Sequence, residues 1–379
     1  MPQNQDELTV RAVQTQAQLN HFIHLPERLY RDDPNWISPL LFEQKERFSR
    51  KNPYFLHARW QAWVAWRGDR PVGRISAQID DLHLQKFQDR TGHFGCLEAE
   101  NDPQVFARLF EEAENWLREA GMQRVTGPFN LSINEECGLQ IEGFDTPSRI
   151  MMVHGRPFYA QAVEAAGFHK AVDLIAYRQH PDFEVPRVMQ RLVSKVADQI
   201  HIRPLNRKRL KSELELLRDI FNDAWSENWG MVPITEAEFE EVGKFMTLLI
   251  DDDFVQIAEV DGQPAAMIVC LPNINEAIQD LHGRLLPFGW LKLLWRLKVR
   301  YPETARIPLM GVRKKYHHTL FGPALSFLLT DTLRYPVLAR GIREMEMSWI
   351  LEHNSGMRSI IESLGGKACQ TFRLYEKAL

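Results

Sequence analysis

A short basic segment between an apolar strand and an apolar helix holds the residues best suited to bind a phosphate-bearing ligand. Residues 313–324 read RKKYHHTLFGPA, and the flanking patterns predict a strand at 306–312 and a helix at 325–333. The first N–H groups of a helix lack partners within it, and the helix dipole adds partial positive charge there. With basic side chains beside it, such a helix start favours an anion, so we expect this segment to bind a pyrophosphate.

The elements around this segment form a longer pattern. Residues 344–350 alternate as a strand, Asn354 is suited to cap a helix at 355–364, and residues 367–375 predict a last strand or hairpin. The order is therefore strand, loop with Gly-x-Ala, helix, strand followed by Glu-x-Asn, helix ending in Gly-Gly, and terminal strand. This order resembles the GNAT superfamily of acyl-CoA N-acyltransferases.

The loop pattern of that superfamily is Gln or Arg-x-x-Gly-x-Gly or Ala, and here it falls on Thr319, Gly322 and Ala324. The resemblance implies that backbone amides of this loop hold the pyrophosphate of an acyl-CoA cosubstrate. Thr319 departs from the pattern because it lacks a long basic side chain. The residues predicted to contact the cofactor, including basic neighbours that could supply the missing charge, are Gly311, Val312, Arg313, Lys314, His318, Thr319, Leu320, Phe321, Gly322, Ala324 and Asn354.

Acyl transfer from a thioester to an amine needs a neutral amine, a donor to the tetrahedral oxyanion and a proton for the thiolate. It needs neither an enzyme nucleophile nor a metal, so we expect no metal. The resemblance implies a backbone N–H near Gly311 or Val312 as the oxyanion donor. Glu352 or His353, after the next strand, would accept the proton of the amine directly or through water.

Two other roles follow from the resemblance. The tyrosine that protonates the thiolate in that superfamily falls on Ile361 here, so Tyr316 and Tyr375 are candidate replacements. Asn354 matches an asparagine that commonly contacts the pantetheine arm. Its alternative role is a helix N-cap, and the two roles are compatible.

Residues 285–300 form an insertion that the minimal fold does not need. Leucines and tryptophans alternate there with Lys292, Arg296, Lys298 and Arg300, a composition typical of a helix that lies on anionic lipid. The alternative is a core helix with snorkelling cations. Either would give an apolar wall beside the thioester, with room for a long acyl chain and a lipid amine.

The acceptor pocket is expected after the helix at 210–221, with the end of the hairpin at 254–270 on the same rim. The alternatives are a tryptophan core contact and an ordinary turn. The predicted substrate-binding residues are Trp225, Asn228, Trp229, Asn273, Asn275, Glu276 and Trp290.

The first half of the chain repeats this order of elements. Its hairpin turn has Pro71 where the second half has Pro264, an offset of 264 − 71 = 193, and Gly167 and Gly365 give 365 − 167 = 198. We therefore expect two tandem GNAT-like folds of the α/β class with a mixed sheet, as domains 1–180 and 181–379. Common turn residues are the alternative source of this similarity. The loop position of the first copy, residues 98–103, reads EAENDP, and its carboxylates predict a copy without catalysis.

Composition limits the remaining classes. The 379 residues carry a net charge of −4, which argues against nucleic acid as the main partner. The four cysteines form no C-x-x-C pair, and the first residues lack the basic and apolar regions of a signal peptide. We expect a cytoplasmic protein, with peripheral contact to the inner membrane face through residues 285–300. The oligomeric state cannot be predicted.

The whole layout resembles a bacterial family of double GNAT proteins that includes the bacterial ceramide synthases, which acylate a sphingoid amine from acyl-CoA. The motifs that carry this resemblance are Asn228-Trp229-Gly230, Leu286-Pro287-x-Gly289, the segment from Trp349 to Asn354 and the terminal segment from Arg373 to Lys377. A Fem-type transferase that uses aminoacyl-tRNA is one alternative, and the balanced charge counts against it. A CoA-binding scaffold without activity is the other; the isoleucine at 361 favours it, and the Gly-x-Ala loop opposes it.

Overall fold

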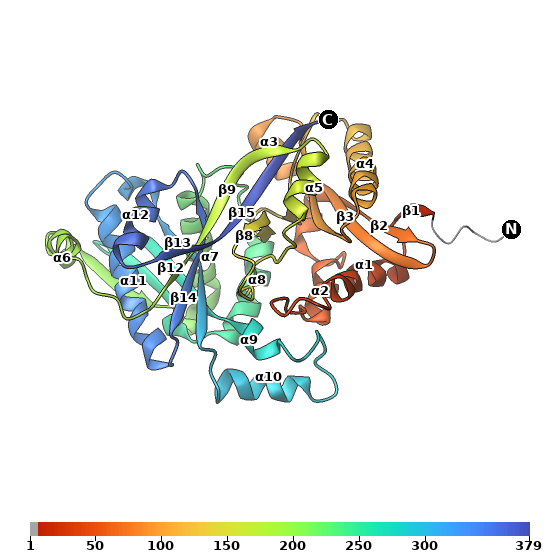
Figure 1. Cartoon of the computed structure of the whole chain (residues 1–379). Coiled ribbons are helices and arrows are strands. Elements are labelled where there is room, and N and C mark those ends of the chain that lie inside the picture. The colour runs from red at the N-terminus through yellow and green to blue at the C-terminus, as the bar shows by residue number, and fades with distance from the viewer. Residues whose placement is uncertain (1–6) are drawn as a thin grey trace. The chain divides into compact units, whose positions relative to one another are not determined.

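The computed structural model describes residues 7–379, without the side chains of residues 244–249. Two compact units are formed (Figure 1). The N-terminal unit comprises Met1–Leu174, Ile278–Leu286 and Gln370–Leu379, and the C-terminal unit comprises Ile175–Ala277 and Pro287–Cys369. The predicted boundary between residues 180 and 181 stays a prediction.

The sheet of the N-terminal unit is mixed. Strands β4 and β5 are parallel, the other pairs are antiparallel, and β15 pairs with β5 so that Tyr375 lies opposite Gly127. In order along the sheet its strands are β1 (Leu8–Ala12), β2 (Ala58–Arg67), β3 (Arg70–Asp80), β4 (Thr91–Ala99), β5 (Arg124–Gly127) and β15 (Lys367–Ala378). Shorter strands are β6 (Phe129–Asn130), β7 (Glu136–Cys137) and β8 (Leu139–Glu142), and the helices are α1 (Gln16–Leu29), α2 (Leu41–Arg47), α3 (Asp81–Phe87), α4 (Pro103–Glu119) and α5 (Tyr159–Ala165).

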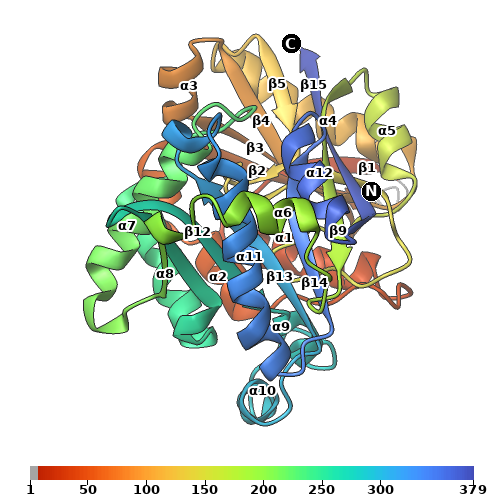
Figure 2. The ribbon, with the colours of Figure 1, turned by 90° about the vertical axis from the view of Figure 1, so that its left-hand side faces the viewer.

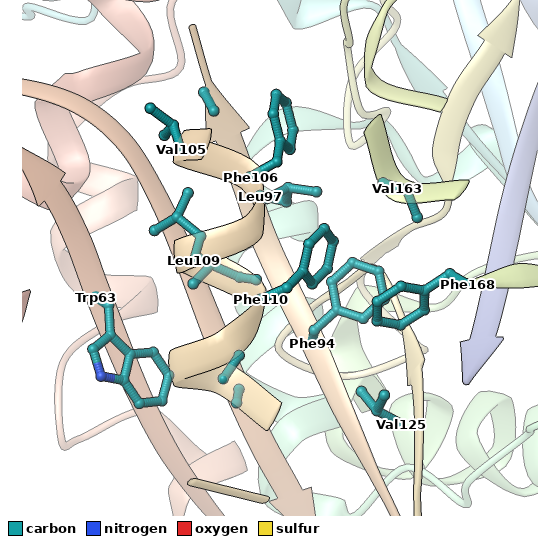
Figure 3. Close-up of a cluster of buried hydrophobic side chains, with 14 of the residues drawn as sticks. Trp63, Phe94, Leu97, Val105, Phe106, Leu109, Phe110, Val125, Val163 and Phe168 are labelled. Carbon is teal, nitrogen blue, oxygen red and sulfur yellow. The ribbon is translucent and has the colours of Figure 1, made fainter. Parts of the chain in front are cut away.

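Helix α4 builds much of the core of this unit (Figure 3). Val105 and Leu109 recur at helical spacing and are completely buried, and Phe110 packs against Phe94 and Phe168. Asp102 caps the helix, and Pro103 is its first residue, as the sequence predicts.

The C-terminal unit has the same plan. Its sheet follows the order β9 (His169–Gln179), β14 (Glu344–Leu351), β13 (Thr304–Val312), β12 (Gln263–Pro272), β11 (Val255–Val260) and β10 (Ile200–Pro204). β13 and β14 are parallel, and β10 to β13 are antiparallel. Its helices are α6 (Arg187–Val193), α7 (Leu210–Ala224), α8 (Glu236–Leu249), α9 (Ile274–Ile278), α10 (Gly289–Lys298), α11 (Phe321–Ala339) and α12 (Ser355–Ser363).

Helices cover both faces of this sheet. Phe327 of α11 and Leu364 after α12 belong to one apolar cluster, and Figure 2 shows α11 in front of β12 and β13. On β13, a Cβ added to Gly311 would meet Trp225, directly after α7. Met310, the neighbour of Gly311, instead accepts a hydrogen bond at its sulfur from Thr330 of α11. Successive strand residues face opposite sides, so α7 and α11 lie on opposite faces.

Local irregularities repeat in the two copies. The hairpin β2–β3 shifts register between Ala65 and Trp66, and β11–β12 shifts between Ala258 and Glu259, which is 193 residues later. A second bulge lies in the next strand of each copy, where that strand carries one extra residue. In the first copy, Glu98 and Gly95 of β4 lie opposite Arg74 and Ser76 of β3. In the second copy, Leu309 and Arg306 of β13 lie opposite Val269 and Leu271 of β12. Matched bulges are far more specific than matched turn residues, and the predicted mixed α/β tandem fold is confirmed.

Candidate active site in the C-terminal unit

Strands β13 and β14 separate partway along their length. Their parallel register runs from Thr304 opposite Glu344 to Ile307 opposite Met347, whereas β13 continues to Val312. The bulge of β13 lies at this point, and the next residues, 308–310, are only partly buried. A strand edge without a partner offers backbone N–H and C=O groups to an extended chain with amides, such as a pantetheine arm.

Gly311 at the end of β13 is required by packing. A Cβ at this position would lie 2.2 Å from Trp225 and 3.1 Å from Ala224 of α7. Trp225 also stacks on Phe221, with ring centroids 4.8 Å apart. The structure thus brings a predicted cofactor residue, Gly311, together with a predicted substrate residue, Trp225.

The basic loop closes tightly onto the start of α11. A short 3-10 turn, Lys314–Tyr316, begins it, and the carbonyl of Val312 lies 2.6 Å from Nε2 of His317. Thr319 accepts a hydrogen bond from the N–H of Phe321 at 3.1 Å. A Cβ on Gly322 would lie 2.8 Å from the carbonyl oxygen of Tyr316, so this glycine is needed for the close approach of loop and helix.

The side chain of Leu320 makes no capping bond, so apart from the bond from Phe321 to Thr319 the start of α11 and the positive end of its dipole are left for a ligand. Two of the basic residues expected to supply charge here are directed elsewhere. Arg313 donates to Asp219 at 2.6 Å and to the carbonyl of Pro264 at 2.9 Å. The ammonium of Lys314 lies 3.5 Å from Glu227. Lys315, which the sequence analysis did not select, and His318 are exposed in the loop.

The residues after β14 begin a helix. Asn354 accepts a hydrogen bond from the N–H of Met357 at 3.1 Å, so its expected role as a helix cap is confirmed. His353 is exposed, and the carbonyl of Glu352 accepts from Arg358 at 2.9 Å. The ends of parallel strands β13 and β14 meet at one edge of the sheet, which places these residues at the same edge as the basic loop. Their catalytic roles stay predictions.

The two candidate tyrosines lie in different surroundings. Tyr316 belongs to the basic loop, with its ring 5.7 Å from that of Phe321. Tyr375 lies in β15 in the core of the N-terminal unit, is completely buried, and donates to Glu164 at 3.1 Å. Burial raises the pKa of Tyr375 well above its ordinary value. Tyr375 is therefore not among the residues that the C-terminal unit brings together.

The predicted substrate residues do not share one rim. Asn273 donates to Thr304 at 3.0 Å, and Glu276 also bonds Thr304, the first residue of β13. Trp225 lies against Gly311, near the last residue of that strand, and Asn228 and Trp229 follow in the same segment. β12 runs antiparallel to β13, so its end meets the beginning of β13, about 20 Å from Gly311. The expectation of a common rim is wrong for this reason, and contact of each residue with substrate stays a prediction, as it does for Asn275 and Trp290.

A buried polar cluster beside the separation point was missed by the sequence analysis. Arg306 donates to the hydroxyl of Ser348 at 2.9 Å, and that hydroxyl donates to Glu346 at 2.9 Å. All three side chains belong to residues at most 2% exposed. The Arg306 guanidinium also lies over the Trp349 ring, 4.8 Å from its centroid. The alternation of polar residues 344, 346 and 348 in a central strand was the available signal.

This cluster is not a requirement of the fold. The matched bulges make Arg306 the counterpart of Gly95, where an added Cβ would lie 1.7 Å from the carbonyl oxygen of Phe129. The same bulge also places Arg306 on the face of the sheet that α7 covers at Gly311. On β12, Arg306 lies opposite Leu271 and Gly311 lies opposite Met267, and these two partners are on the same face. A buried ion cluster that the fold can do without is a candidate functional feature.

In the N-terminal unit the equivalent region is filled by its own chain. The side chain of Asn130 accepts from the N–H of Cys96 at 2.8 Å. Glu98 accepts from Tyr30 at 2.6 Å and from Tyr159 at 2.9 Å, and burial raises the pKa of Glu98 above its ordinary value.

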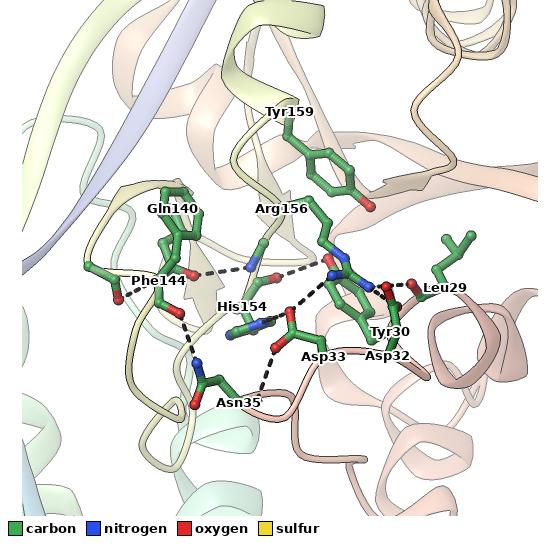
Figure 4. A network of polar contacts seen from close by, with 12 residues as sticks. Leu29, Tyr30, Asp32, Asp33, Asn35, Gln140, Phe144, His154, Arg156 and Tyr159 are labelled. Atoms are coloured by element: carbon green, nitrogen blue, oxygen red, sulfur yellow. Dashed lines mark hydrogen bonds and ion pairs between the residues drawn. The ribbon is translucent and has the colours of Figure 1, made fainter.

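The polar network around Tyr30 continues through the same unit (Figure 4). The carbonyl of His154 accepts from the Tyr30 hydroxyl at 3.3 Å, and Nε2 of His154 lies 3.0 Å from Asp33. Arg156 also pairs with Asp33, at 3.4 Å, and donates to the carbonyl of Leu29 at 2.8 Å. These contacts join the segment after α1 to the segment before α5. The predicted absence of catalysis in this copy stays a prediction, and the filled region agrees with it.

Comparison with known proteins supplies the family. No protein-family model matches the chain. Protein YghO of Escherichia coli is 50% identical over 371 residues, covering 98% of this chain and 95% of that protein. The bacterial ceramide synthase of Caulobacter vibrioides is 47% identical over 376 residues, covering 98% of both proteins.

Solved structures show the same fold at low identity. A tandem GNAT protein from the clavulanic acid biosynthesis pathway matches with a TM-score of 0.55 and 13% identity over 98% of both chains. A GCN5-related glucosamine N-acetyltransferase region of a fungal multi-domain β-N-acetylglucosaminidase matches with a TM-score of 0.58 and 14% identity, covering 98% of this chain and 38% of that one.

Proposed function

Because the chain belongs to the same protein family as the bacterial ceramide synthase of Caulobacter vibrioides, we propose that it transfers an acyl group from a CoA thioester to the amine of a long-chain lipid base. The observation that carries this proposal is the identity of 47% over nearly the full length of both proteins. The tandem GNAT fold supports the reaction class, and acyl-CoA is the corresponding donor.

The donor site that we propose lies at the end of β13 and the start of α11. The pyrophosphate would take N–H groups at the start of α11 other than that of Phe321, and the charge of Lys315 and His318. The pantetheine arm would pair with the open edge of β13 beyond Ile307. Val312, Phe321, Gly322 and Ala324 shape the site rather than supply charge.

The reaction that we propose is direct. The amine nitrogen attacks the thioester carbonyl, a C–N bond forms, and the C–S bond breaks. Glu352 or His353 accepts the proton that the amine loses, and Tyr316 gives its proton to the departing thiolate. A backbone N–H near Gly311 stabilises the oxyanion.

We also propose where the enzyme works. All four cysteines are free thiols, which fits the reducing cytoplasm. A lipid base is held in a bilayer, so the enzyme would work at the inner membrane face, in contact through residues 285–300. None of the helices within residues 7–379 has the length and apolar character to traverse a bilayer.

The test compares acylation and binding in two variants that differ in one charge. Leu320→Asp and Leu320→Asn place side chains of nearly equal size at the start of α11, at a position 53% exposed. Only the aspartate repels a pyrophosphate. We expect Leu320→Asp to weaken palmitoyl-CoA binding, measured by calorimetry, by at least roughly tenfold, and Leu320→Asn to stay close to the parent protein.

Activity is measured with palmitoyl-CoA and sphinganine, by release of the CoA thiol and by mass spectrometry of the amide. Formation of the amide by the parent protein is the expected result. If the protein binds no CoA species and releases no thiol, the proposal fails, and a transferase that uses aminoacyl-tRNA or a scaffold without activity remains.

A further inference from the structure

Helix α10 of the C-terminal unit presents apolar side chains to solvent. Leu297 is buried and Leu293 is partly buried, so this side of the helix faces the protein. Large apolar residues at positions 288, 291, 295 and 299 recur at spacings of three and four on the opposite side. Trp290 and Leu294 are exposed on the flank, nearer to Leu297. We call these residues the outer stripe: Phe288, Trp290, Leu291, Leu294, Trp295 and Val299, between 44% and 71% exposed.

The charged residues of the segment that carries the outer stripe all have one sign. Residues 287–302 contain no aspartate or glutamate, although the whole chain has a net charge of −4. The cations of this segment are Lys292, Arg296, Lys298 and Arg300. An apolar stripe whose own segment supplies only cations is complementary to a surface that is apolar below and anionic above.

The helix is held in place from its inner side. Arg296 donates to the carbonyl of Ala277 in α9 at 2.7 Å, and Leu297 packs inward. In both views α10 lies at the periphery of its unit, beyond α9 (Figures 1 and 2). The outer stripe is therefore presented on an anchored helix.

We propose that the outer stripe docks the protein on the surface of an anionic lipid bilayer. Its leucines and tryptophans enter the boundary between headgroups and acyl chains, while Lys298 and Arg300 contact lipid phosphates. This inference rests on the proposed function, because an enzyme that acylates a lipid amine must take that substrate from a bilayer. The outer stripe would supply the contact with the bilayer.

A second copy of the chain fits the stripe less well. In a two-fold dimer the same patch faces itself, so the cations of one segment would meet those of the other, with no carboxylate from this segment between them. An anionic bilayer instead supplies the missing negative charge.

The experiment measures binding of the purified full chain to vesicles, without substrate. One set of vesicles contains phosphatidylcholine and phosphatidylglycerol at roughly 3:1, and the other contains phosphatidylcholine alone. We expect clear partitioning to the anionic vesicles, lowered roughly a hundredfold by Leu294→Asp combined with Trp295→Asp. Lys298→Gln with Arg300→Gln should lower it roughly twentyfold, since each cation contributes about fivefold near such a surface.

A matched control places the same charges on exposed apolar residues elsewhere. Val188 and Leu56 are 75% and 81% exposed, so Val188→Asp with Leu56→Asp should leave partitioning within about twofold of the parent. Equal binding to both kinds of vesicle, or loss of binding in the control, overturns the proposal. A dimer of the parent protein would also overturn the proposal, if ultracentrifugation shows that Leu294→Asp with Trp295→Asp dissociates it and if the parent protein does not bind vesicles. Vesicle binding is measured without substrate and does not depend on catalysis, so it tests the docking surface even if the proposed acyl transfer is not found.

Discussion

The starts of helices α4 and α11 hold the same place in the two copies, yet only α4 is closed by its own chain. α4 follows β4 after three residues, 100–102, and Asp102 accepts from the N–H of Gln104 at 2.9 Å while pairing with Arg67. α11 follows β13 after eight residues, 313–320, and no side chain caps it. A capping carboxylate takes both the free N–H and the dipole that an anionic ligand would need. The donor site that we propose at α11 therefore uses a helix start that Asp102 closes in α4.

The strand edges beside these helices differ in the same sense. Asn130 takes the N–H of Cys96 in the first copy, and Gly95 lies under the backbone of Phe129. In the second copy the corresponding bulge carries Arg306, and β13 runs on past its pairing with β14. The first copy is sealed by polar side chains of its own, whereas the second keeps an open edge next to a buried charge cluster.

The largest effect on stability and turnover is expected at the buried cluster of Arg306 and Glu346, since the counterpart of Arg306 in the first copy is Gly95. Glu346→Gln removes the carboxylate that the buried Arg306 reaches through the Ser348 hydroxyl, and it should lower the free energy of unfolding by roughly 3 kcal/mol. Combining it with Arg306→Met should restore most of that stability, yet turnover should stay at least roughly a hundredfold low. Denaturant titration and initial rates check the two quantities separately. Recovery of both together would make the cluster purely structural.

The two tyrosines sharpen the comparison between the site and the core. Tyr316→Phe should lower kcat roughly tenfold if this hydroxyl protonates the thiolate. Tyr375→Phe removes a hydroxyl that donates to Glu164 inside the other unit, so kcat should stay within about twofold. Rates with the acyl donor in excess measure both variants. A tenfold loss in Tyr375→Phe with Tyr316→Phe unaffected would reverse the assignment.

The sealed copy should respond to acid. Burial lowers the pKa of His93 well below the ordinary value of 6.5, and its Nδ1 lies 2.8 Å from the Thr126 hydroxyl. The unfolded chain binds a proton there below about pH 6.5 and the folded chain does not, so stability is kept above that pH and lost as pH falls. We expect a loss of up to about 1.4 kcal/mol per pH unit between pH 6.5 and 5.5, reduced in His93→Gln. Unfolding curves at the two pH values test it, and an unchanged slope in the variant would contradict it.

The smallest effect concerns the cap itself. Asp102→Ala should lower the free energy of unfolding by about 1 kcal/mol, because α4 loses its side-chain cap. The KM for acyl-CoA should not change, since the donor site that we propose belongs to the other copy. Thermal unfolding and steady-state kinetics measure the two effects. A raised KM would show that the first copy takes part in donor binding.

The sequence predicts the elements of both copies well, because turn residues and helix caps are local signals. It predicts their alignment less well. The offset is 193 at the hairpin turns, 309 − 98 = 211 at the strand bulges, and 198 at the glycines after α5 and α12. The β12–β13 connection with α10 lengthens the second copy, and the long segment before α5 lengthens the first. The near-constant offset therefore comes from two insertions that nearly cancel.

The candidate site was predicted in part. The basic loop and the cap at Asn354 follow from local pattern, and the structure contains both. The helix after the loop begins at Phe321, four residues earlier than predicted, so Gly322 and Ala324 lie in its first turn. Arg306 and Glu346 were missed because their proximity depends on a bulge and on strand register, which are nonlocal. Asn273 was placed at the wrong end of β13, although the antiparallel direction of β12 was sufficient to predict its position.

The contact between Gly322 and the carbonyl of Tyr316 has a consequence for recognising enzymes of this kind. The glycine that identifies the loop is required by the chain's own folding, because any side chain would collide with the loop it follows. A descendant that had lost all activity would be under the same steric demand and would keep the motif. The presence of Gly322 therefore indicates only that the loop packs closely against the helix. Evidence of activity has to come from residues that the fold does not require, such as Leu320 and Lys315.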